Sequence, residues 1–108
     1  MHGDRPEVSG EEIDHRLLLL DPRDNVFVAR VPLRGGDDVI IDGASVAVAR
    51  DVAVGFKIAR RRIALGGEVI KYGAIIGITT RDVDAGERVH TDNMKSNYIA
   101  PHLNPDGS

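Results

Sequence analysis

The sequence contains no cysteine, which excludes a disulfide framework, a thiol nucleophile, an iron–sulfur cluster and a thiolate zinc site. No apolar run approaches the roughly 20 residues that a membrane-spanning helix needs. The first residues are charged and lack the apolar stretch of a secretory signal, so we expect a cytoplasmic protein with no membrane partner. The formal net charge is −3, which argues against a nucleic-acid partner because such proteins usually present a basic surface.

Aromatic residues are scarce as well, at 4% of the chain with no tryptophan, so the core must be aliphatic. The 12 valines and 10 isoleucines outnumber the 7 leucines, and β-branched residues favour strands. Twelve glycines and five prolines indicate many turns. A chain of 108 residues has the size of one domain, and we expect that domain to be mainly β.

Apolar and polar segments divide the chain into three parts. Residues 1–14 are polar and aperiodic and predict a flexible N-terminal arm. Residues 96–108 contain two prolines and little apolar content, and predict a C-terminal tail. Residues 15–95 lie between them and form the predicted domain.

Short apolar runs separated by turn residues predict hairpins in this domain. Leu17–Leu20 and Val26–Ala29 flank a cluster of turn residues. Asp42-Gly43, a turn dipeptide, separates Val39–Ile41 from Ser45–Ala49. Ile75–Thr80 is typical of a further strand.

A seven-residue unit recurs, with an apolar residue at each end and glycine in the middle. It occurs at Val52–Ile58, Ile63–Val69 and Val83–Val89, and more weakly at Leu33–Val39. Its glycines are separated by 19, 11 and 20 positions, too irregularly for a solenoid. We expect each unit to be a brief helical turn in which a buried aliphatic residue ends one segment, glycine adopts positive φ and a second aliphatic residue begins a strand.

The repeated unit leads to two further predictions. Asp51 and Asp82 stand just before two copies, where a carboxylate can cap the turn. The apolar ends of the three stronger copies should be buried: Val52, Ile58, Ile63, Val69, Val83 and Val89.

Segments around these turns carry a family resemblance. They are Asp24–Ala29, Val54–Ala59, Gly67–Gly73 and Ala85–Asn93, and the more specific part is VIKYGxxIG followed by AGxxVHTxN. They resemble the SAF domain, a β-clip module, and in particular the N-terminal region of altronate and galactarate dehydratases. The resemblance covers about residues 17 to 95 and implies an SAF-type β-clip of short strands.

The resemblance also implies a function. Family members are lyases that remove water from a hexonate or hexarate to give a 2-keto-3-deoxy acid, with a divalent metal, iron or manganese. This chain resembles the small subunit, which completes the active site of a larger catalytic chain. The resemblance implies that the metal is bound mainly by the larger chain and that the subunits form an oligomer. Two alternatives stay open: the small subunit of a sulfolactate sulfo-lyase, and a non-catalytic SAF module that binds carbohydrate.

Dehydrating a sugar acid requires a base that removes the proton next to the carboxylate and an acid that protonates the departing hydroxyl group. It also requires a metal or cations that stabilise the doubly charged intermediate. No complete active site is visible, so we do not expect the chain to be active alone. The candidates that the chain offers are His90 as a catalytic residue and metal ligand, Asp92 as a metal ligand, and Lys57, Lys71, Tyr72 and Asn93 as substrate-binding residues.

This chain departs from the family pattern at two positions, Phe56 and Asp92, where histidine is usual. Asp92 keeps an oxygen ligand for a hard divalent ion, whereas Phe56 has none. With Val89 facing inward, strand alternation puts His90 on the other face. We expect His90, Asp92 and Asn93 to lie on one surface with the two candidate lysines.

Overall fold

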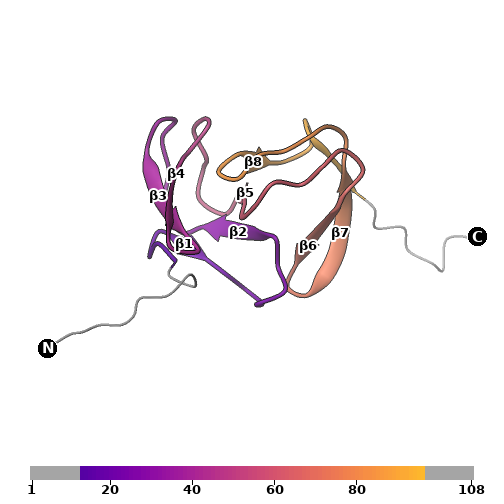
Figure 1. The fold of residues 1–108 in the computed structure, drawn as a ribbon, viewed down its shortest axis with the longest axis horizontal. Helices are drawn as coiled ribbons and strands as arrows, with labels where there is room; N and C mark the ends of the chain where they lie inside the picture. Colours follow the sequence, from indigo (N-terminus) through magenta and orange to yellow (C-terminus); the bar gives the residue numbers. More distant parts are fainter. Residues whose placement is uncertain (1–12, 97–108) are drawn as a thin grey trace, which may run out of the picture.

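The computed structural model describes residues 13–96, and in that range the chain forms short strands and no helix (Figure 1). The predicted mainly β class is therefore confirmed. No helix among the described residues is long and apolar enough to cross a membrane. The strands are β1 (Leu17–Leu18), β2 (Val26–Ala29), β3 (Asp38–Ile41), β4 (Ala44–Ala47), β5 (Lys57–Ala59), β6 (Glu68–Lys71), β7 (Ala74–Thr79), β8 (Arg88–Val89) and β9 (Met94–Ser96).

The strands form three antiparallel groups. β1, β2, β5 and β8 make a four-stranded sheet in that order, β3 pairs with β4, and β6, β7 and β9 make a three-stranded sheet. Figure 1 shows β2, β5 and β8 between two hairpins, with β3–β4 on the left and β6–β7 on the right. The predicted pairing of Leu17–Leu20 with Val26–Ala29 and the hairpin around Asp42-Gly43 are both confirmed.

The central sheet separates two hydrophobic cores because successive residues of a strand face opposite sides. Phe27 and Ile58 lie opposite each other and belong to the first core. Val26 and Ala59 also lie opposite each other and belong to the second core, which contacts the β6–β7 side of the molecule through Val69. All six aliphatic residues predicted to be buried at the ends of the repeat units are buried.

The recurring glycine unit forms the same turn in all four copies. Gly36, Gly55, Gly66 and Gly86 have φ angles of 94°, 87°, 81° and 87°, as the unit predicts, since these left-handed angles favour glycine. The turns are closed by backbone hydrogen bonds such as that from the Phe56 amide to the Ala53 carbonyl. They are β-turns, and the brief helical turns expected there are absent from the described residues.

Two bridges explain the irregular spacing of the units. Leu33 pairs with Val52, and Ile63 pairs with Val83, so the first two units close one half of the domain and the last two close the other. The separations of 19 and 20 positions lie within a half, and that of 11 lies between the halves.

Asp51 and Asp82 each cap a turn, but it is the turn of the bridged unit earlier in the chain and not the turn directly after them, where the cap was predicted. The Asp51 carboxylate accepts a 2.9 Å hydrogen bond from the Gly35 amide, and the Asp82 carboxylate accepts one of 2.8 Å from the Leu65 amide. Each cap ties the turn of one unit to the segment that precedes its bridged partner. The sequence therefore encodes the same local device twice.

The ends of the domain differ slightly from the predicted boundaries. Ile13 forms a bridge with Ile41, and the Asp14 carboxylate accepts a hydrogen bond from the Ile40 amide, although both residues were assigned to the N-terminal arm. Ser96, assigned to the C-terminal tail, belongs to β9. The rest of the predicted arm and tail lies outside the described residues.

Candidate functional site

The predicted site residues lie in two groups. Lys57 lies opposite Val28 and Val89, so it shares the face of the second core. Arg88 lies opposite Ile58 and shares the face of the first core, and His90 follows two positions later. Strand alternation therefore separates Lys57 from the segment of His90, and the single surface that we expected is divided between two faces of the central sheet.

The first group is the lysine surface, which we define as Lys57, Lys71 and Tyr72. Lys57 begins β5 and is half-buried, and Lys71 ends β6. Within residues 13–96, neither ammonium group makes a hydrogen bond or ion pair. Burial, and then the positive charge of Lys71, lower the pKa of Lys57. Two cations without a counter-ion, one of them partly removed from water, favour the binding of an anion.

Tyr72 is held beside Lys71 in a conformation that is rare for a bulky residue. Its φ is 57°, and the residue is 75% exposed. The buried Asp24 carboxylate accepts hydrogen bonds of 2.8 Å from the amides of Tyr72 and Gly73. Left-handed backbone at a large residue costs about 1–2 kcal/mol and persists where the surroundings fix it. Asp24 therefore fixes a turn that projects an aromatic ring into solvent.

The second group begins with the turn from His90 to Asn93. Asn93 is fully buried. Its side-chain oxygen accepts a 2.8 Å hydrogen bond from the His90 amide, and its side-chain nitrogen donates one of 2.7 Å to the Arg88 carbonyl. Both polar ends of Asn93 are thus engaged by backbone, so in this structure Asn93 positions His90 and does not face a substrate.

Asp92 lies among guanidinium groups, which we call the arginine cluster: Arg50, Arg81 and Arg88. Its carboxylate is 3.9 Å from Arg50, 3.8 Å from Arg81 and 3.5 Å from Arg88. No group of three or more histidine, aspartate or glutamate side chains suited to a metal occurs within residues 13–96. The oxygens of Asp92 face cations, so the described residues do not fit a metal ion held by this chain alone.

The two departures from the family pattern meet at one residue of this cluster. The Arg88 guanidinium lies 5.9 Å from the centre of the Phe56 ring and also contacts Asp92. The Phe56 ring lies 4.7 Å from the His90 ring at an angle of 42°. Phe56 and Asp92 are therefore parts of one arrangement that fixes Arg88 and His90. Arg88 was not among the residues predicted from the sequence, although Phe56 and Asp92, which replace the usual histidines, both contact it.

Fold and site together define a small β domain with two cationic surfaces that suit acidic ligands. A family model described as the altronate/galactarate dehydratase SAF domain matches residues 15–97. The chain therefore belongs to this family of SAF domains, as its sequence motifs predicted.

Two relatives of moderate identity are named altronate dehydratase. The chain is 45% identical over 74 residues to the altronate dehydratase of Escherichia coli (strain K12), covering 68% of this chain and 15% of the relative. It is 35% identical over 80 residues to the altronate dehydratase of Bacillus subtilis (strain 168), covering 74% of this chain and 16% of the relative. The chain thus matches only about a sixth of the length of either relative.

Proposed function

We propose that this SAF domain binds a sugar acid for a hydro-lyase of the altronate dehydratase type, and that it works as a small subunit with a larger catalytic chain. The observation that carries the proposal is the lysine surface, with two neighbouring ammonium groups that have no partner among the described residues. A carboxylate is the natural counter-ion for such a pair. The likeness to altronate dehydratases supports a sugar acid as its source.

The chemistry assigns a role to each part of the surface. Lys57 and Lys71 bind the carboxylate of the incoming sugar acid in the recognition step. The exposed Tyr72 ring packs against the carbon chain of the sugar acid, and its rigid turn limits the entropy lost on binding. Asp24 acts as a positioning residue because it holds that turn.

The proposal leaves most of the reaction to the partner. A divalent metal, which would stabilise the negative charge of the intermediate, is held mainly by the larger chain in this proposal, because the described residues supply no metal-ligand group. His90 is the proposed acid–base residue of this chain. Since it lies away from the lysine surface, its role requires the larger chain to bring substrate to the turn at Asn93.

Binding of galactarate and D-altronate to the purified chain, followed by NMR of the lysine side chains, tests the recognition step. We expect Lys57 and Lys71 signals to shift, and the pKa of Lys57 to rise on binding because an anion favours the charged form. Galactitol, which has no carboxylate, should produce no shift.

Two variants make this test specific. Lys57→Met should weaken galactarate binding by about ten-fold or more, the scale of one charged hydrogen bond, whereas Lys95→Met, an exposed lysine on β9, should leave it unchanged. Equal effects of the two variants would contradict the proposal. Tighter binding of sulfolactate than of either sugar acid would favour the sulfo-lyase alternative.

A further inference from the structure

The arginine cluster is an open surface around Arg88, which faces the other side of the central sheet from Lys57. The exposed fractions of the side chains are 56% for Arg50, 44% for Arg81 and 24% for Arg88, and that of Asp92 is 41%. The three arginines come from different segments, two from the connections before β5 and β8 and one from β8 itself. The fold therefore gathers three accessible guanidinium groups around one carboxylate.

The cluster has more hydrogen-bond donors than Asp92 uses. Its contacts with Asp92 are 3.5 to 3.9 Å long, whereas a strong bond between a guanidinium and a carboxylate is about 2.7–2.9 Å. The Nε atom of Arg88 is buried and has no hydrogen-bond partner among residues 13–96. Glu87 engages Arg81 at 2.6 Å and is the second acid of the group. Three positive charges therefore meet two negative ones, and one of those two is held loosely.

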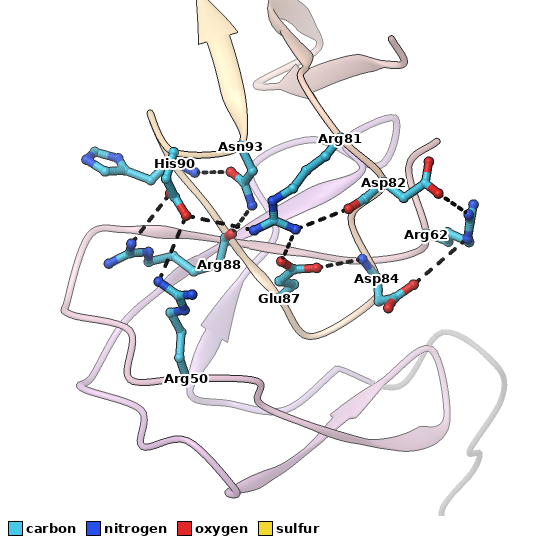
Figure 2. A network of polar contacts seen from close by, with 10 residues as sticks. Arg50, Arg62, Arg81, Asp82, Asp84, Glu87, Arg88, His90 and Asn93 are labelled. Atoms are coloured by element: carbon cyan, nitrogen blue, oxygen red, sulfur yellow. Dashed lines mark hydrogen bonds and ion pairs between the residues drawn. The ribbon is translucent and has the colours of Figure 1, made fainter. Parts of the chain in front are cut away.

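The guanidinium groups are nevertheless held in place. Arg88 lies over the Phe56 ring, and Arg81 donates a 3.2 Å hydrogen bond to the Asp82 carbonyl in addition to its pair with Glu87. Figure 2 shows Arg81 extended between Glu87 and Asp82. Fixed donors with spare capacity lose little entropy when an acid binds.

We propose that the arginine cluster binds a carboxylate supplied from outside residues 13–96, and that Asp92 is a built-in competitor which this carboxylate displaces. The incoming group forms the short, two-pronged bonds to Arg88 that Asp92 does not make. Its source is either a free sugar acid or an acidic side chain of the larger catalytic chain. The site lies on another face from the lysine surface and does not depend on the function assigned there.

A matched pair of charge-neutralising variants tests whether Asp92 competes with an incoming carboxylate for the arginine cluster. Asp92→Asn removes the internal carboxylate from the cluster. Asp84→Asn removes an exposed carboxylate whose one ion pair within the described part of the chain is with Arg62. Binding of galactarate is followed through the side-chain Nε–Hε NMR signals of the arginines. We expect Asp92→Asn to bind about ten-fold more tightly than wild type, the scale of one charged hydrogen bond, and Asp84→Asn to bind as wild type does.

Adding Arg50→Ala to Asp92→Asn should cancel the gain, and adding Arg62→Ala should not. These results would identify a free sugar acid as the source. If galactarate shifts no arginine signal, the remaining source of the carboxylate is an acidic side chain of the larger chain. Arg50→Ala should then weaken the complex with the larger chain about ten-fold, whereas Arg62→Ala should leave it intact. Equal affinities of Asp92→Asn and Asp84→Asn, together with an unchanged complex for Arg50→Ala, would overturn the proposal.

Discussion

Gly55 and Gly86 form a matched pair that tests how the repeated turns are packed. Both have a φ of 87°. A Cβ atom added at Gly55 would meet nothing within 4 Å, whereas one added at Gly86 would lie 2.6 Å from the Ala47 carbonyl oxygen and 2.7 Å from a methyl group of Val46. The same substitution therefore meets the same backbone strain at both positions but a steric clash at only one.

The two costs can be estimated separately. Left-handed backbone at alanine costs about 1–2 kcal/mol, and this is the whole expected loss for Gly55→Ala. Forcing extra volume into a packed contact costs about 1–3 kcal/mol more, so Gly86→Ala should lose about 2–5 kcal/mol. The reduced freedom of the unfolded chain favours alanine equally in both variants and cancels from the comparison.

Thermal unfolding followed by circular dichroism measures the difference. In a domain of this size 1 kcal/mol corresponds to about 4–8 °C in Tm, so Gly86→Ala should melt at least about 4 °C below Gly55→Ala. Gly66→Ala, at a φ of 81° with no atom within 4 Å of the added Cβ, should behave like Gly55→Ala. Equal melting temperatures for all three variants would refute the packing of β4 against the last turn.

Three further predictions concern charged residues. Asp14→Asn should lower Tm at pH 7, because hydrogen bonds from Arg16 lower the pKa of Asp14. This stabilisation is fully present above the usual aspartate pKa of 3.8 and is lost as the pH falls further. A Tm difference between wild type and Asp14→Asn that is the same at pH 7 and pH 2 would contradict this reasoning. Lys57→Met should raise Tm at pH 7, because burial lowers the pKa of Lys57 and the charged form is therefore costly in the folded state; the gain should shrink as the pH rises toward the usual lysine value of 10.5, and a loss of stability at pH 7 would show that Lys57 is structural. His90→Ala should reduce turnover of the complex with the larger chain about 100-fold, the scale of a lost acid–base group, and a loss of only a few-fold would assign proton transfer to the partner.

Local patterns in the sequence predicted much of this fold. The glycine units fixed four turns with positive φ, since only a residue without a Cβ atom adopts that backbone freely. Asp51 and Asp82 do form caps, but on the turns of the bridged units and not on the turns that follow them, which their positions had indicated. The glycine turns depend on a few adjacent residues, and the amino-acid types report them directly, whereas the partner of each cap depends on the bridge within its half.

Contacts between distant segments were not predictable in the same way. Asn25 is buried and hydrogen-bonds through its side chain to the backbone of Glu68 and Ile70, more than 40 positions away. Asp24 fixes the turn at Tyr72 across a similar separation. Nothing in the surrounding sequence distinguishes these side chains from ordinary turn residues, because their partners are set by how the β6–β7 hairpin packs against β2.

The division of the candidate site has the same origin. His90 and Lys57 were expected on one surface because each follows a repeated glycine turn. The register of β5 against β8 determines which face of the sheet each residue occupies, since it pairs Lys57 with Val89 and Ile58 with Arg88. A shift of one residue would exchange the faces, and the sequence alone does not determine that register.

Turnover of D-altronate by the larger catalytic chain, measured with and without this domain, tests the central claim most directly. The wild-type domain should restore formation of the 2-keto-3-deoxy acid. At subsaturating substrate the Lys57→Met domain should restore at most about a tenth of that rate, whereas the Lys95→Met domain should restore it fully. Full activity of the larger chain alone, or equal activity with the Lys57→Met and Lys95→Met domains, would contradict the claim that this domain recognises the substrate.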